Sequence, residues 1–308
     1  MQPGLHNLDA ETYHADPAPK VSLSASILKI VLSESLLHAW HAHPKLNPNW
    51  KPNTSRAAEI GSVAHKLALG VGADVQIIAA ENYRTKAAQE ARDAAQAARK
   101  IPCLQSDYAD AESLATPLRE ALEDYLGAHV ADCLVEHSFV WQENGMWRRA
   151  MLDIVTRDLM RAADLKTSTA SVAPMAAARR IYDSNYHIQA GFYLRGLDAL
   201  DPDNVGRRTF GFVFGEQNEP HAVSPPIELS EAGLEMARQQ IDVGVALWDH
   251  ALRTNVWPGY STDILIAEPP SWALTQWQTR YETDESLNPR VDGPRELRKL
   301  DILTGAMS

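Results

Sequence analysis

The sequence of 308 residues contains little cysteine and no long apolar run. Its two cysteines, Cys103 and Cys133, form no C-x-x-C pair, and two thiols are too few for a structural zinc or an iron–sulfur cluster unless histidines join them. No stretch approaches the roughly 18 apolar residues that cross a bilayer. The first residues lack the basic start and apolar core of a signal peptide. We therefore expect a cytoplasmic protein without membrane contact, whose thiols are free and buried.

The sequence also lacks a G-x-x-x-x-G-K-[ST] motif, so no P-loop motor is expected. It has an excess of acid, with 29 Lys and Arg against 40 Asp and Glu and a net charge of −11. This balance argues against a simple nucleic-acid coat protein, which needs clustered basic residues. The segment 148–208, however, holds 10 basic and 7 acidic residues. A binding groove is therefore expected in this locally basic middle of the chain.

Apolar periodicity predicts a helical first part and a later β-rich part. Helices are expected from Ser22 or Ser24 through the segment ending at His43, from Ser55 to about Leu69, at 83–99 and at 110–128. Strands are expected at 133–147 (with an Asn144-Gly145 turn), 147–155, 161–167 and 208–215, with 221–227 as a partner of the last. Two further helices are expected, from Pro174 to about Leu200 and at 230–254.

This order predicts an α/β (α+β) fold, a small mixed β-sheet flanked by helices. We divide the chain into a helical N-terminal region at 1–130, a core at 131–262 and a polar, loosely packed C-terminal tail at 263–308. The N-terminal region is expected to be part of the same domain as the core. The first 20 residues are expected to be irregular because Pro17 and Pro19 interrupt any helix.

The strongest chemical pattern is Asp164-Leu165-Lys166 on a predicted strand, preceded by Asp153 on the strand before it. Residues i and i+2 of a strand share a face, so Asp164 and Lys166 project side by side. If the strands are antiparallel neighbours, the Asp153 carboxylate converges with that of Asp164, and the Leu165 carbonyl lies near. Such an oxygen site suits Mg²⁺ or Mn²⁺, and the ammonium can orient a water for phosphodiester hydrolysis.

Each piece also has a plainer interpretation. An isolated D-x-K is usually a surface ion pair, although Ala162 and Ala163 make this strand look poorly solvated. Gln189 and Tyr193 share a helix face at i, i+4 and could touch a phosphate, brace metal ligands or merely pack against the protein. His65, on an apolar helix after Gly61, is more often a core histidine than a metal ligand.

Taken in order, G-x-x-x-H, a lone Asp, D-x-K and Q-x-x-x-Y resemble the motif set of the RecB-like branch of PD-(D/E)XK nucleases. More narrowly, the sequence resembles the RecE-type exonucleases (exodeoxyribonuclease VIII), including phage and prophage relatives, over roughly residues 10–262. The resemblance implies a PD-(D/E)XK nuclease core. It implies the following roles: metal ligation by His65, Asp153, Asp164 and the Leu165 carbonyl; positioning or activation of water by Lys166; and support of DNA backbone contact by Gln189 and Tyr193.

The resemblance implies a Mg²⁺-dependent exodeoxyribonuclease, with Mn²⁺ able to substitute. It would act on double-stranded DNA ends, 5′→3′, leaving 3′ single-stranded tails for recombination. A ring-like homo-oligomer and a single-strand annealing protein as partner are further expectations. The missing cluster cysteines and motor fit a standalone enzyme. A restriction- or repair-type endonuclease and a non-catalytic DNA-binding or annealing protein remain alternatives.

Several charged residues are weaker candidates. Glu136, on the first predicted strand, could be an auxiliary acidic group, although an exposed glutamate on a strand is common. Paired arginines near the motifs are candidate phosphate contacts, although such pairs are usually just solvated: Arg148 and Arg149, Arg179 and Arg180, and Arg207 and Arg208.

Overall fold

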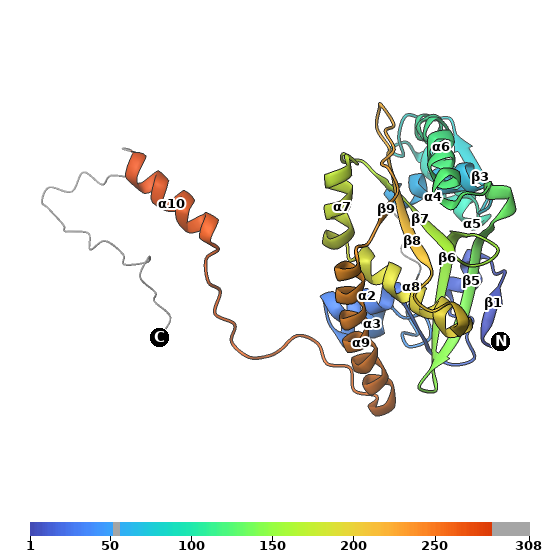
Figure 1. The fold of residues 1–308 in the computed structure, drawn as a ribbon. Helices are drawn as coiled ribbons and strands as arrows, with labels where there is room; N and C mark the ends of the chain where they lie inside the picture. The colour runs from blue at the N-terminus through green and yellow to red at the C-terminus, as the bar shows by residue number, and fades with distance from the viewer. Residues whose placement is uncertain (52–55, 285–308) are drawn as a thin grey trace, which may run out of the picture. The chain divides into compact units, whose positions relative to one another are not determined.

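The computed structural model describes residues 1–51 and 56–284. The chain forms two compact units, Met1–Tyr260 and Ser261–Ser308. The first unit contains a mixed sheet with helices on both sides (Figure 1). In the second, α10 (Ser271–Thr283) is a regular helix with no buried residue, where the sequence led us to expect only a loose tail. No proline or glycine interrupts these 13 residues, which explains why a helix forms there.

The main sheet has the strand order β1-β5-β6-β7-β8-β9, and β2 pairs with β6 outside this path. The pairs β7–β8 and β2–β6 are parallel and the other pairs antiparallel, so the predicted mixed sheet is confirmed. The strands are β1 (Gly4–His6), β2 (Ser22–Ser24), β5 (Leu134–Glu143), β6 (Met146–Val155), β7 (Arg161–Ser168), β8 (Thr209–Glu216) and β9 (Ile227–Glu228).

The hairpin of β5 and β6 turns where the sequence predicts. Asn144 and Gly145 have φ angles of 52° and 75°. Positive φ at both central residues is the geometry of a type I′ turn, which matches the twist of the flanking strands and favours Asn-Gly. This turn sets the register of the long hairpin, which carries Asp153 on its second strand.

Helices cover both faces of the sheet (Figure 1). Strand β8 shows how the faces differ: Phe210, Phe212 and Phe214 enter one apolar cluster, whereas Val213 enters the other. The phenylalanine face packs against α2 (Ala25–Ser33), α3 (Leu36–Ala42), α8 (Tyr186–Leu200) and α9 (Glu231–Thr254). The opposite face packs against α4 (Arg56–Leu69) and α6 (Gln105–Leu126). At Gly211 a Cβ would lie 2.6 Å from the Tyr125 ring, so glycine allows α6 to pack directly on the sheet.

Two helices predicted as continuous are each broken. The segment from Pro174 to Leu200 forms α7 (Pro174–Asp183) and α8, because Asn185 between them has φ 55°. Asparagine adopts this left-handed conformation more readily than most residues. The segment from Ser22 to His43 forms α2, capped by Ser24, and α3, capped by Ser35, whose side chain accepts a hydrogen bond from the His38 amide.

Several short elements were not predicted from the sequence, because elements of three to five residues leave little periodic pattern. Helix α1 (Ala10–His14) and strand β1 lie in the segment expected to be irregular. A second sheet pairs β3 (Val75–Ile78) in parallel with β4 (Ile101–Leu104), with α5 (Lys86–Ala97) between them in sequence. Two 3₁₀ turns occur at Val130–Asp132 and Pro202–Asn204. None of the described helices is both long and apolar enough to cross a membrane.

Arg148 is a correction to the predicted DNA contacts. Its side chain is fully buried, and Nη2 donates to both carboxylate oxygens of Asp249 on α9, at 2.8 and 2.7 Å. A guanidinium enclosed in this way cannot reach a phosphate. Arg148 instead joins α9 to strand β6. Removing one partner of such a buried ion pair leaves the other charge buried without compensation.

We therefore predict opposite outcomes for breaking and for replacing this pair. Asp249→Ala leaves a buried, unpaired guanidinium and should lower the free energy of unfolding by about 3–5 kcal/mol. The double variant Arg148→Met, Asp249→Leu removes both charges and should recover most of that loss. Urea unfolding of the three proteins measures both effects. A double variant less stable than Asp249→Ala would contradict this account.

Candidate active site

Strands β6 and β7 separate at the two candidate carboxylates. Their ladder contains only the pairs Val155↔Ala162 and Ile154↔Ala163, and the next residue on each strand is Asp153 and Asp164. Past this point the Leu165 amide donates to Asp153 Oδ2 at 2.8 Å instead of to a strand carbonyl. The separation of the strands therefore opens a gap in the sheet, and the Asp153 carboxylate satisfies the backbone amide exposed there.

His65 reaches the same gap from helix α4. Its Nε2 lies 3.0 Å from the Leu165 carbonyl oxygen and 3.3 Å from Asp153 Oδ2. One turn earlier, a Cβ at Gly61 would lie 3.2 Å from Thr167 Oγ1, tighter than most real contacts. Glycine at this position therefore lets α4 approach β7 closely enough for His65 to reach the gap, which gives the G-x-x-x-H spacing a physical reason.

Asp164 and Lys166 contact each other, as their i, i+2 spacing predicts. The Asp164 carboxylate is buried, with Lys166 Nζ against Oδ2 and the Gln189 amide donating to Oδ1. Burial by itself would lower the pKa of Lys166, but the carboxylates of Asp164 and Asp153 outweigh it, and the pKa is raised. Lys166 is therefore an ammonium at neutral pH, able to orient water or stabilise negative charge rather than accept a proton.

The expected DNA contacts by Gln189 and Tyr193 need correction. Both side chains are buried on α8, and Tyr193 packs edge-on against Phe139 and Phe210. Burial raises the pKa of the Tyr193 hydroxyl well above its usual range. Of the alternatives for the Q-x-x-x-Y pair, the bracing role fits: Gln189 holds Asp164 in place, and Tyr193 fixes the helix against the sheet.

Tyr186 is a site residue that the sequence analysis missed. Its ring centroid lies 4.7 Å from Lys166 Nζ, within range of a cation–π interaction. The available indication was its position three residues before Gln189 on the same helix, which places both on one face. Tyr186 therefore helps to fix the direction of the Lys166 ammonium.

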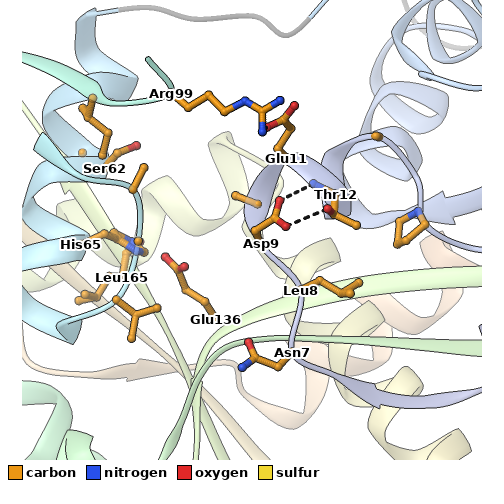
Figure 2. Close-up of a pocket in the computed structure, with 18 of the residues that line it drawn as sticks. Asn7, Leu8, Asp9, Glu11, Thr12, Ser62, His65, Arg99, Glu136 and Leu165 are labelled. Atoms are coloured by element: carbon orange, nitrogen blue, oxygen red, sulfur yellow. Dashed lines mark hydrogen bonds and ion pairs between the residues drawn. The ribbon is translucent and has the colours of Figure 1, made fainter. Parts of the chain in front are cut away.

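A cavity of about 1240 Å³ borders the site (Figure 2). His65, Leu165 and Lys166 line one side, and the N-terminal segment 7–12 with 15–17 lines the other. Pockets for small ligands have volumes of about 300–1,000 Å³, so this cavity has room for part of a polymer. An exposed ion pair of 3.2 Å between Glu11 and Arg99 joins the N-terminal segment to the end of α5.

Glu136 lies at this cavity, between His65 and the N-terminal segment (Figure 2). It has φ 49°, which is uncommon for a residue with a side chain. The β5–β6 register pairs Val135 with Ile154 and His137 with Leu152, so Glu136 occupies the position opposite Asp153 without pairing to it. Backbone conformations of this kind concentrate at functional sites. Its placement keeps Glu136 a candidate for the auxiliary acidic group.

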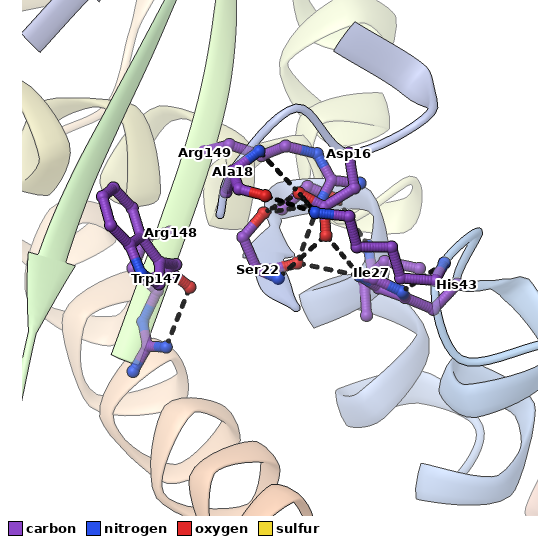
Figure 3. Close-up of polar contacts among 10 residues, drawn as sticks. Asp16, Ala18, Ser22, Ile27, His43, Trp147, Arg148 and Arg149 are labelled. Atoms are coloured by element: carbon purple, nitrogen blue, oxygen red, sulfur yellow. Dashed lines mark hydrogen bonds and ion pairs between the residues drawn. The ribbon is translucent and has the colours of Figure 1, made fainter. Parts of the chain in front are cut away.

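Arg149 is a second correction to the predicted DNA contacts. It is buried, and its Nη1 donates to the backbone and side-chain oxygens of Ser22, both at 2.7 Å (Figure 3). It also lies 3.4 Å from Asp16, whose carboxylate accepts from the Ser22 amide and hydroxyl. His43 faces the same carboxylate at 3.4 Å, and burial lowers the pKa of His43 to about 4. This cluster anchors the N-terminal segment that lines the cavity.

The remaining paired arginines divide by burial. Arg208 is buried between Asp198 and Asp201, so it too is removed from the list of phosphate contacts. Arg179 is exposed and, within the described ranges, pairs with Asp183 alone, one turn away on α7, and Arg180 donates to the Ser171 carbonyl. The locally basic segment is therefore largely neutralised by internal ion pairs, and Arg179 and Arg180 remain candidates for phosphate contact.

The donor set fits a hard divalent cation. Neighbouring ligands of an octahedral Mg²⁺ at about 2.1 Å lie about 3 Å apart, close to the separations measured from His65 Nε2 to Leu165 O and Asp153 Oδ2. Asp164 Oδ2 is buried and has no regular hydrogen bond among the described residues, although the Lys166 ammonium is against it. Among those residues, no group of three His, Cys, Asp or Glu side chains is arranged to hold a metal ion, and Asp164 contacts Lys166.

The Asp153 carboxylate yields a prediction for the metal-free protein. Burial, and then the negative charge of Asp164, raise its pKa from 3.8 to about 6. The folded protein then holds this proton more tightly than the unfolded chain, so its stability falls as the pH rises from about 4 to 6. In EDTA, Asp153→Asn should raise Tm by about 2 °C or more at pH 7.5 and leave it nearly unchanged at pH 4. A lower Tm for the variant at pH 7.5 would contradict the assignment of the shift to Asp153.

Comparisons with known proteins bear on the family and the fold of the chain. The family model described as PDDEXK-like domain of unknown function (DUF3799) matches residues 24–267. A crystal structure of a protein named "Putative exonuclease", from Eubacterium rectale, is similar with a TM-score of 0.59 at 14% identity, over 88% of this chain and 98% of that one. A crystal structure of SSO0001 matches 71% of this chain and 84% of that one at 13% identity, with a TM-score of 0.25, which is too low to indicate a shared fold. No curated protein matches the sequence.

The TM-score of 0.59 to the solved structure shows a shared fold. At 14% identity the likeness shows nothing about function. The family model, in contrast, spans most of the chain and includes every motif from Gly61 to Tyr193. On this basis the protein belongs to the PDDEXK-like family DUF3799, within the PD-(D/E)XK nuclease superfamily.

Proposed function

We propose that the protein is a metal-dependent exodeoxyribonuclease of the RecE-like type, which hydrolyses phosphodiester bonds from the ends of double-stranded DNA. The observation that carries this proposal is the convergence of His65, Asp153 and the Leu165 carbonyl with the Asp164–Lys166 pair where β6 and β7 separate. The proposal also includes the 5′→3′ direction, the 3′ tails made for recombination and an annealing protein as partner. These three points rest on the sequence resemblance.

The residues divide the work in a way that the contacts support. His65, Asp153, Asp164 and the Leu165 carbonyl would hold Mg²⁺, or Mn²⁺ in its place. When bound, the cation supplies Lewis-acid stabilisation of charge on the phosphate oxygens. The Lys166 ammonium orients the attacking water and stabilises the developing negative charge. Gln189 and Tyr186 set the directions of Asp164 and Lys166, respectively.

The proposal is tested on end-labelled linear duplex and on covalently closed circular duplex, each with Mg²⁺. We expect degradation of the linear DNA from its ends and survival of the circle. Lys166→Ala should reduce the rate by about 10²–10³, the usual loss when one stabilising group is removed from a transition state. Cleavage of the circle would indicate an endonuclease with the same site. Equal rates for Lys166→Ala and wild type would refute the site.

A matched control tests whether the removal of a lysine ammonium elsewhere on the protein also lowers the rate. Lys86 lies on α5 with its side chain 90% exposed, so Lys86→Ala removes the same group without disturbing the site. It should retain the wild-type rate. Labels at the 5′ and 3′ ends of separate substrates report the direction of degradation, and early release of the 5′ label is expected.

The resemblance also leads us to propose a ring-like homo-oligomer that encloses the DNA and keeps it bound between steps. Sedimentation equilibrium at micromolar protein should give a mass that is a multiple of the 34.0 kDa chain. A monomer mass, with and without duplex DNA, would contradict this prediction without affecting the proposed chemistry.

A further inference from the structure

Lys29 on helix α2 is a cation near the candidate site that none of the proposed roles uses. Its Nζ lies 5.4 Å from the centroid of the Tyr186 ring, the same ring that Lys166 Nζ approaches to 4.7 Å. Two ammonium groups from different parts of the fold therefore contact one aromatic side chain. Helix α2 and strand β7 bring them together, although 137 residues separate them in the sequence.

The backbone that carries Lys29 is fixed. Ser24 caps the helix by accepting from the Ile27 amide, and Ile27, Leu28 and Val31 are buried in the core around Lys29. Contacts between α2 and α8 hold this helix against the one that carries Tyr186. The Lys29 side chain therefore has a limited range of positions, all on the side of the helix that faces Tyr186.

Within the described part of the chain, Lys29 Nζ has no carboxylate partner and no hydrogen-bond acceptor; Lys166, in contrast, contacts Asp164. Burial and, after it, the positive charge of Lys166 lower the pKa of Lys29, while Asp164 opposes them. Holding a cation away from water and near a like charge is costly unless an anion compensates it. The Tyr186 ring only partly offsets that cost, because a cation–π contact is weaker than pairing with an anion.

We propose that Lys29 and Lys166 form a two-lysine phosphate site around Tyr186, in which Lys29 binds the non-bridging oxygens of a substrate phosphate next to the one that is cleaved. This assignment rests on the proposed nuclease function. The substrate anion supplies the partner that Lys29 lacks in the free protein. Lys166 then remains available for the phosphate at the carboxylates, and Tyr186 contacts both ammonium groups.

Binding measurements separate this role from a structural one. Duplex DNA is titrated at several salt concentrations with Ca²⁺ in place of Mg²⁺, and its integrity is checked on a gel. Lys29→Met keeps the apolar stem but removes the charge. It should weaken binding about tenfold and reduce the slope of log K against log [salt] by about 0.9, the release of roughly one counterion. Lys29→Arg should restore most of both, and Lys86→Met should match wild type.

Rates with Mg²⁺ give a second readout. Lys29→Met should raise KM for DNA about tenfold and change kcat much less, because it loses binding to a phosphate that does not react. If Lys29→Met lowers Tm but leaves the salt slope and KM unchanged, Lys29 only fastens α2 to α8 and the proposal is wrong. If wild type degrades DNA and Lys29→Met behaves identically to it, this inference also fails while the proposed function stands. Absence of cleavage by wild type would instead count against the proposed function.

Discussion

The separation of β6 and β7 after Ile154↔Ala163 is the constraint on which the candidate site depends. A continued ladder would bond the Leu165 amide and carbonyl to β6 and would place Asp153 and Asp164 in an ordinary cross-strand pair. Because the strands part, the amide is free to hold Asp153 and the carbonyl to face His65. The gap therefore frees backbone groups that would otherwise join the two strands, and they contact the candidate site residues instead.

The opening in the sheet contains the buried carboxylate of Asp164, and the surrounding side chains compensate for its charge. The Asp164 carboxylate is 2% exposed, and an isolated charge at such a position would cost several kcal/mol. The Lys166 ammonium pairs with Oδ2, the Gln189 amide donates to Oδ1, and Tyr186 positions Lys166. Asp153 is less fully compensated, as its raised pKa shows. The charge of Asp164 is compensated by Lys166, whereas that of Asp153 is compensated only in part. A bound cation would stabilise the ionised form of Asp153.

Buried ion pairs also decide how the rest of the fold surrounds the site. Arg148 fastens α9 to the sheet through Asp249, and Arg149 joins the cluster of Asp16, Ser22 and His43 that anchors the N-terminal segment. The segment so anchored lines the cavity opposite His65 and Lys166. Arg148 and Arg149, which were candidate DNA contacts, are therefore buried residues that hold the surrounding segments in place. Lys29, which lies in the N-terminal helical region, supplies positive charge beside Lys166 instead.

Features that depend on local pattern could be predicted from the residues alone. The Asn144-Gly145 hairpin, the D-x-K strand and the mixed sheet follow from turn chemistry and strand periodicity, whereas the meeting of His65 with Asp153 was implied by the family resemblance. Pattern did not show which charges are buried, where β6 and β7 part, that Glu136 lies opposite Asp153, or that Lys29 meets Tyr186. Those outcomes depend on contacts between segments distant in the chain, such as Arg148 with Asp249. Periodicity records which face of an element is apolar, but not which distant side chain meets it.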